Sequence, residues 1–220
     1  MATETVAGTR GPYRTGIRRK EQIVSAAIDV FGEFGFAGGT IRSIAERVGV
    51  SHAALLQHFG SKEGLLMAVL QEWDRRTVDD GLAGLSGLDY LFALPETAAS
   101  HTSQRGLLEL FTTIAAEASS PTHPAHDYIQ RRYSANLATL SAHIRRAAAA
   151  GEIRSMTASD ITREVRLITA VLDGIGLQWL LDPSTDIREA VEAYIRRSVA
   201  AWSDPLRPAA ASGPRGTRRP

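Results

Sequence analysis

Apolar residues recur along most of the chain at intervals of three and four positions, which is the period of an amphipathic α-helix. Clusters of glycine, proline and serine interrupt the pattern, and no stretch alternates apolar and polar residues as a strand would. The pattern therefore predicts an all-α protein. The expected helices are residues 18–34, 41–48, 52–59, 62–78, 88–94, 104–118, 124–150, 157–181 and 186–203.

The segment from Thr40 to Phe59 predicts two short helices joined by a tight turn. Thr40 and Ser51 are expected N-caps, because a side-chain hydroxyl accepts a hydrogen bond from an unpaired backbone N–H. Gly49 suits the left-handed residue that ends a helix. Two helices joined in this way form a helix-turn-helix, whose second helix is built to enter a DNA major groove.

The preceding helix completes a small core for this unit. We expect its regular part to stop at Gly35 and Phe36 to plug the core, giving a three-helix DNA-binding domain over residues 17–60. The inner stripe is expected to consist of Ile23, Ala27, Val30, Phe31 and Phe34.

The remaining helices predict a C-terminal helical-bundle domain over residues 61–203. The helix over 88–94 is expected to break before Pro95. The helix over 157–181 opens at Thr157, with Asp160 three positions on, and is apolar nearly all round. Such a helix must be covered on every side.

Composition limits the class of protein. The 220 residues are 44% apolar and 22% charged, as in an ordinary globular protein, and contain no cysteine, which favours a reducing cytoplasm. No apolar run has the length of a membrane span and we expect no secretory signal, so the expected location is cytoplasmic, in association with the nucleoid.

Net charge is only +1, but basic residues concentrate at both ends. Residues 1–16 and 204–220 are expected to be a disordered basic arm and a disordered basic tail, able to lie on phosphates. A solvated tail without that role is the alternative for 204–220.

Motifs of catalysis are missing from the sequence. It contains no Ser-His-Asp order, glycine-rich phosphate loop or cysteine nucleophile, which argues against a helical enzyme. His123 and His126 lack a nearby third ligand, so a polar loop explains them better than a metal site. We expect neither a metal nor a cofactor.

The pattern resembles the TetR/AcrR family of one-component transcriptional regulators, most clearly over residues 23–66. The matching positions are Gly35-Phe36, Thr40, Ile44-Ala45, Gly49-Val50-Ser51, His58-Phe59, Ser61-Lys62-Glu63 and Leu65. Residues 117–133 and 172–183 also resemble one subset of the family's effector domains. Two positions depart from the family pattern: Ala53 replaces a frequent glycine, and Leu56 replaces a tyrosine that commonly touches a DNA phosphate in family members.

With this resemblance, the polar and small residues of the second helix are the expected readers of DNA. Gln57 can pair with adenine, His52 can reach a base edge, and Ala54 can touch a thymine methyl group. A merely solvated face is the alternative for His52 and Gln57. The expected DNA-binding residues are Thr40, Arg42, Ser51, His52, Ala54, Gln57, His58 and Lys62, with Thr40, Arg42, Ser51 and Lys62 on phosphates.

Polar residues on apolar stripes of the bundle are candidates for contact with a small-molecule effector, because a buried polar group is costly unless paired. Glu117, Asn136 and Asp173 are such residues; pairing with Arg132, Arg166 or a backbone group is the alternative. The expected ligand-binding set is Trp73, Phe111, Glu117, Tyr133, Asn136 and Asp173.

The last two helices are the expected dimer interface, because the resemblance implies a four-helix interface there and Gly174 leaves room for close approach. The expected dimerisation residues are Val171, Gly174, Ile175, Gln178, Trp179, Val191, Ile195 and Trp202. The resulting prediction is a homodimeric repressor, released by a small molecule from a palindromic operator in double-stranded DNA. A ligand-independent regulator or an activator remains open.

Overall fold

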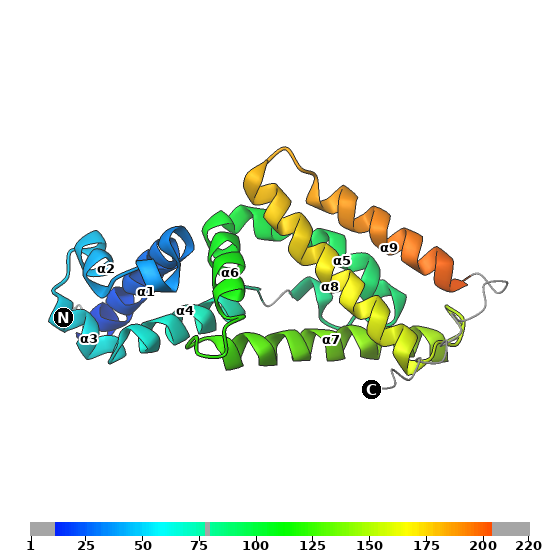
Figure 1. Cartoon of the computed structure of the whole chain (residues 1–220), viewed down its shortest axis with the longest axis horizontal. Helices are drawn as coiled ribbons and strands as arrows, with labels where there is room; N and C mark the ends of the chain where they lie inside the picture. Colours follow the sequence, from blue (N-terminus) through cyan, green and yellow to red (C-terminus); the bar gives the residue numbers. More distant parts are fainter. Residues whose placement is uncertain (1–11, 78–79, 204–220) are drawn as a thin grey trace, which may run out of the picture. The chain divides into compact units, whose positions relative to one another are not determined.

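The computed structural model describes residues 12–77 and 80–203 of the chain, and within these ranges it is helical and contains no strand (Figure 1). The all-α prediction is confirmed. The α-helices are α1 Pro12–Gly38, α2 Ile41–Val48, α3 His52–Phe59, α4 Lys62–Thr77, α5 Leu88–Ser100, α6 Arg105–Glu117, α7 His126–Ala149, α8 Ala158–Leu181 and α9 Ile187–Ser203. Two short 3₁₀ helices are η1 Asp80–Leu82 and η2 His101–Gln104.

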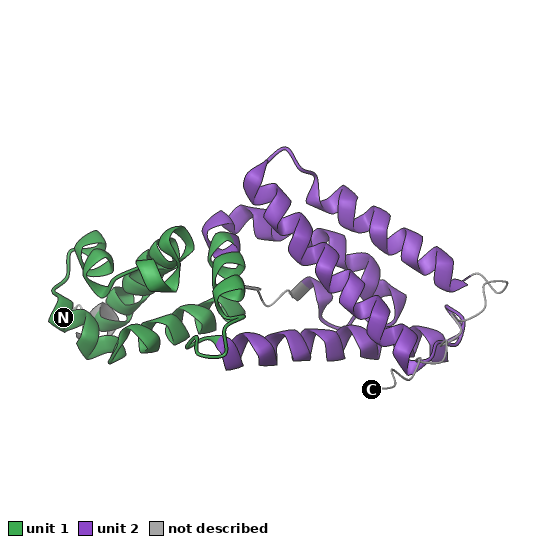
Figure 2. Ribbon diagram, viewed as in Figure 1, with its two compact units in different colours: residues 1–77, 109–125 green, residues 78–108, 126–220 purple. Residues whose placement is uncertain are grey.

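The chain divides into two compact units, coloured separately in Figure 2. Unit 1 contains residues 1–77 and 109–125, and unit 2 contains residues 78–108 and 126–220. Unit 1 therefore includes α4 and the C-terminal part of α6 as well as the three helices predicted over residues 17–60.

The core of unit 1 forms where α1 packs against α2 and α4, and where α3 packs against α2 and α4. Burying these aliphatic and aromatic side chains supplies most of the driving force for folding. Its fully buried large side chains are Ile23, Phe31, Ile44, Leu55, Leu65, Leu66, Leu70, Leu110 and Ile114.

Unit 2 is built around α5, which packs along α9 and α7, while α8 packs against α7 and α9. Figure 1 shows α8 and α9 as an antiparallel pair. Its core includes Leu91, Ile144, Ile168, Val191 and Ile195.

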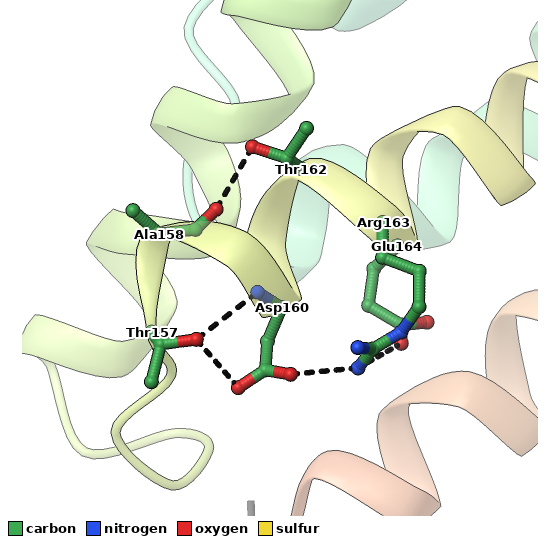
Figure 3. A network of polar contacts seen from close by, with 6 residues as sticks. All are labelled: Thr157, Ala158, Asp160, Thr162, Arg163 and Glu164. Carbon is green, nitrogen blue, oxygen red and sulfur yellow. Dashed lines mark hydrogen bonds and ion pairs between the residues drawn. The ribbon is translucent and has the colours of Figure 1, made fainter. Parts of the chain in front are cut away.

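The start of α8 is fixed by the polar network of Figure 3. The Thr157 hydroxyl accepts from the Asp160 N–H at 3.1 Å and donates to the Asp160 carboxylate at 2.8 Å, as the predicted cap requires. Arg163 donates to the other carboxylate oxygen at 2.8 Å. The bonds from Thr157 and Arg163 lower the pKa of the buried Asp160, which stays charged and paired.

The N-terminal prediction was wrong at residues 12–16, which belong to α1 rather than to a disordered arm. Residues 1–11 and 204–220 of the expected arm and tail lie outside the described residues, as does Val78 at the expected end of α4.

Phe34 was also placed wrongly in the inner stripe, since 54% of its surface is exposed. The ring that joins Phe31 in the core is that of Phe36, with centroids 5.8 Å apart. The backbone turns at Gly35, so the residue after the turn faces inward, as the expected plug does.

The predicted break before Pro95 does not occur, because α5 continues through this residue to Ser100. A proline inside a helix removes one hydrogen bond. Pro95 and Leu91 are buried, and an ion pair joins Glu96 to Arg188 of α9. Tertiary packing of α5 against α9 therefore outweighs the local cost.

Candidate nucleic-acid interface

The predicted helix-turn-helix is formed by α2 and α3. Thr40 caps α2, because its hydroxyl accepts from the Ser43 N–H at 3.0 Å. The Ser43 hydroxyl in turn accepts from the Thr40 N–H, which completes a capping box. Gly49 ends α2 with φ 68° and ψ 40°, and Ser51 caps α3 by accepting from the Ala54 N–H at 3.1 Å. The caps thus fix where α2 begins and ends and where α3 begins, and these predicted caps are confirmed.

One face of α3 is buried and the opposite face is exposed. Leu55 is completely buried in the core of unit 1, whereas His52, Gln57 and His58 are exposed. Ala54 is half-buried. The side chains able to hydrogen-bond to bases thus lie on the solvent side of a helix fixed through Leu55.

The cations flanking α3 have protein partners in this structure. Arg42 donates to Glu46 at 2.8 Å on the exposed side of α2. Lys62 Nζ lies 3.4 Å from the carbonyl oxygen of Ala37 and 4.4 Å from the centre of the Phe36 ring. Lys62 thereby connects the first turn of α4 to the end of α1, a contact that sequence reasoning did not predict.

The end of α1 is a second feature that the sequence did not reveal. Gly35 has φ 68° and ψ 177°, which breaks the helix, and the Phe36 N–H donates to the Glu117 carboxylate of α6 at 2.7 Å. His123 Nε2 lies 3.5 Å from the same carboxylate, and its ring meets Phe36 edge to face. Glu117 thus has both of these partners, the Phe36 N–H and His123, inside unit 1.

The six predicted ligand-binding residues fall into two groups in different units. In unit 1, Trp73 stacks on Phe111 with ring centroids 4.8 Å apart. In unit 2, the Tyr133 hydroxyl donates to Asp173 at 2.8 Å. Asn136 is exposed.

Asp173 is exposed and Tyr133 is half-buried, so the Tyr133–Asp173 pair lies at the surface of unit 2. Partial loss of solvent raises the pKa of Asp173, which the Tyr133 hydrogen bond partly offsets. Burial and the neighbouring carboxylate also raise the pKa of Tyr133. Asp173 therefore has a partner, Tyr133, that the sequence alternatives did not include.

The dimerisation residues predicted on α9 are buried in the single chain. Val191, Ile195 and Trp202 are at most 3% exposed and belong to the core of unit 2. Ile175 of α8 is also buried. The apolar periodicity of α9 marked the face directed at α5 and α8.

Other predicted residues of α8 remain accessible. Gln178 is exposed, Val171, Gly174 and Trp179 are partly exposed, and a Cβ at Gly174 would meet no neighbouring atom. The exposed leucines of this helix belong to its predicted all-round apolar surface but were not among the predicted dimerisation residues. They are Leu167, Leu177 and Leu181.

The described residues contain no group of three His, Asp or Glu side chains arranged to hold a metal ion. His123 instead accepts at Nδ1 from the Ala125 N–H at 3.1 Å, within a polar loop. Across the described ranges, no helix is both long and apolar enough to cross a membrane.

Comparison with known proteins identifies two family models in the chain. Residues 23–69 match the model described as bacterial regulatory proteins of the tetR family. Residues 96–203 match the C-terminal model of BetI-type transcriptional repressors. The first match contains the helix-turn-helix, and the second contains helices α6 to α9.

The curated relatives include the regulator RutR of Escherichia coli strain K12, which is 45% identical over 93 residues. This match covers 42% of each chain, so the chain spans less than half the length of this relative. The repressor Rv1474c of Mycobacterium tuberculosis is 26% identical over 185 residues, covering 82% of this chain and 94% of the relative.

Solved structures share the fold. The structure of SmeT in complex with triclosan superposes with a TM-score of 0.65 at 21% identity, over 86% of this chain and 93% of SmeT.

Proposed function

Because the chain belongs to the TetR family of bacterial regulatory proteins, we propose that it is a homodimeric transcriptional repressor that binds a palindromic operator and is released by a small molecule. The observation that carries this proposal is the arrangement of α3. Leu55 anchors this helix in the core, Ser51 caps its N-terminus, and His52 and Gln57 are exposed to solvent.

The exposed face of α3 is the part that reads sequence. Gln57 offers an amide that can bond an adenine through two hydrogen bonds, and His52 adds a donor or acceptor at a base edge. The N-termini of α2 and α3, at Thr40 and Ser51, supply backbone N–H groups for phosphates. Leu56 offers no hydrogen bond at the family's tyrosine position, so the phosphate contacts rest on the remaining residues.

The exposed face of α8 supports the homodimer. Leu167, Leu177 and Leu181 lie with Gly174 on one side of the helix at a spacing near 3.5 residues. An apolar stripe of this kind is covered when a second copy presents the same face. Two-fold symmetry then sets the recognition helices about 34–36 Å apart, which explains a palindromic operator.

A small molecule would act through its different affinity for the DNA-bound and DNA-free forms. SmeT binds triclosan, and the fold is shared, which supports an apolar aromatic compound as the first class to test. Trp73 and Phe111 remain the proposed contact residues in unit 1, and Tyr133 with Asp173 is a separate candidate in unit 2. Binding would shift α4, which begins at Lys62, directly after the helix-turn-helix.

The test is a fluorescence-anisotropy titration of the purified protein with duplex from upstream of its own gene, compared with a scrambled duplex, at two salt concentrations. We expect selective binding with two chains per duplex. A salt-dependent but sequence-independent affinity would contradict the proposed operator, because phosphate contacts alone lack selectivity.

The same titration, repeated with triclosan and with a panel of related aromatic compounds, tests release. A compound that lowers operator affinity but leaves binding to the scrambled duplex unchanged supports the sensing role. Unchanged operator affinity throughout the panel would favour a ligand-independent regulator, and a compound that raises operator affinity would argue against release.

A further inference from the structure

The end of α1 leaves two backbone groups without their helical partners. In a continuous helix, the Phe36 N–H would donate to the Gly32 carbonyl oxygen four residues earlier. At Gly35, ψ is 177°, far from the helical value of about −42°, so the following N–H is rotated away from the helix axis. A buried or half-buried backbone group that loses its partner must find another.

Helix α6 supplies both missing partners. The carboxylate of Glu117 accepts from the Phe36 N–H at 2.7 Å, and the hydroxyl of Thr113 donates to the Gly32 carbonyl oxygen at 3.3 Å. Thr113 and Glu117 are four residues apart, so they lie on the same face of α6. The side chains of Thr113 and Glu117 thus together replace the single helical hydrogen bond that α1 loses between Phe36 and Gly32.

The fit of this replacement is tight at Gly35. A Cβ atom at this position would overlap the Glu117 carboxylate, and its φ of 68° also disfavours any residue with a side chain. The absence of a side chain thus allows the carboxylate to approach the backbone closely. His123 lies beside the same carboxylate and packs against the Phe36 ring, with ring centroids 5.3 Å apart.

The end of α1 at residues 32–36, which we call the α1 corner, lies next to the DNA-reading elements along the chain. The Lys62 ammonium lies 4.4 Å from the centre of the Phe36 ring, and Lys62 is the first residue of α4. Thr40, the cap of α2, follows Phe36 by four residues. A displacement of Phe36 would therefore be passed to both α2 and α4.

We propose that Glu117, assisted by Thr113, is the positioning residue through which α6 sets the place of the α1 corner and thereby the affinity for the operator. This inference rests on the proposed function, because it takes operator binding as the activity that is set. Glu117 acts through Phe36 and does not itself touch DNA.

The test compares four variants by operator anisotropy and by amide hydrogen exchange at Phe36. Glu117→Ala removes the acceptor and should lower operator affinity about tenfold, within the usual range of coupling between sites. Glu117→Gln keeps an acceptor oxygen and should stay within about twofold of the wild type, while Thr113→Val should lose about threefold. Glu192→Ala removes an exposed carboxylate paired with Arg196 in α9 and should leave affinity unchanged.

Hydrogen exchange separates positioning from a general loss of stability. In Glu117→Ala the Phe36 amide should exchange at least about tenfold faster while the amides of α7 and α8 keep their rates. Operator affinity that is unchanged in a folded Glu117→Ala protein, or that falls equally in Glu117→Gln, would overturn the inference. If Glu117→Ala does not fold, Thr113→Val and Glu117→Gln still decide the question.

The two proposals fail in different ways. A wild-type protein that does not distinguish the operator from the scrambled duplex contradicts the proposed function, and exchange at Phe36 then still tests the anchor. A selective wild type with an unchanged Phe36 amide in Glu117→Ala contradicts the anchor alone.

Discussion

At Gly35 the backbone takes a left-handed φ of 68°, and the space for a side chain is already filled by Glu117. Gly35→Ala should therefore destabilise the protein, by about 1–3 kcal/mol, because it adds both strain and a clash. Urea unfolding followed by circular dichroism measures this change.

Gly16→Ala is the matched control in the same helix. A Cβ at Gly16 would meet no atom within 4 Å, and its φ is not positive, so alanine should stabilise α1 by about 0.5–1 kcal/mol. Equal effects of the two substitutions would contradict the strained corner.

His143 gives the stability of unit 2 a dependence on pH. His143 is 7% exposed, its ring stacks on Tyr90, and Nδ1 has no hydrogen-bond partner in the described structure. Burial, and then the positive charge of Arg146, lower the pKa of this imidazole from its ordinary value of 6.5. The folded protein therefore holds the ring neutral at a pH where the unfolded chain is already protonated.

We expect the free energy of unfolding to decrease as pH falls from about 7.5 through 6.5 and on toward the lowered pKa, since the unfolded state binds the extra proton there. His143→Phe keeps the stacked ring and should flatten this part of the profile. Urea midpoints at several pH values measure it, with His52→Ala as an exposed-histidine control. A profile of the same slope in His143→Phe would contradict this assignment.

At the scale of the helix, α3 separates base reading from structural support. Gln57→Ala should relax the preference at one base pair and cost about 1–3 kcal/mol of discrimination, because it removes a pair of hydrogen bonds to a base edge. Binding to a panel of duplexes that differ at single positions measures this loss.

Lys62→Ala provides the contrast and should weaken binding to all duplexes alike, whether the ammonium reaches a phosphate or only holds the α1 corner. Gln130→Ala removes an exposed glutamine of α7 and is the control. The division of roles would be wrong if Gln57→Ala and Lys62→Ala gave the same pattern across the panel.

The sequence was informative about elements whose signals are local. Caps such as Thr40, Ser51 and Thr157 act within three residues, so the helix-turn-helix and the start of α8 could be predicted from the sequence. The course of α5 through Pro95 could not, because packing against α9 decides it.

The Glu117–Phe36 bond was missed for the same physical reason, since its partners are 81 residues apart and no periodicity links them. The apolar stripe of α9 predicted a dimer interface, whereas in the single chain α9 packs against α5 and α8. Periodicity reports that a face is covered, and not whether the covering helix belongs to the same chain.

At the scale of the whole molecule, the exposed leucines of α8 determine the expected assembly. Leu177 and Leu181 are 45% and 79% exposed in the single chain. Leu177→Glu should raise the dimer dissociation constant by about a hundredfold or more, because an unpaired carboxylate would be buried between the two copies. Sedimentation velocity over a range of protein concentrations measures this change.

Phe92→Glu is the control for the assembly, because Phe92 of α5 is similarly exposed, at 43%, and lies outside the α8 stripe. It should leave the dimer intact. Dissociation caused by Phe92→Glu but not by Leu177→Glu would move the interface from α8 to α5.

The composition of unit 1 has a practical consequence for building hybrid regulators. Residues 109–125 belong to the same compact unit as residues 12–77, and α6 completes the hydrogen bonding of α1 through Glu117 and Thr113. A hybrid in which residues 1–77 are joined to another sensor domain would therefore have a DNA-binding domain whose α1 corner lacks the hydrogen-bond partners supplied by α6. A working chimaera needs a recipient helix that offers an acceptor and a donor four residues apart at that corner, or it must carry the segment 109–125 along.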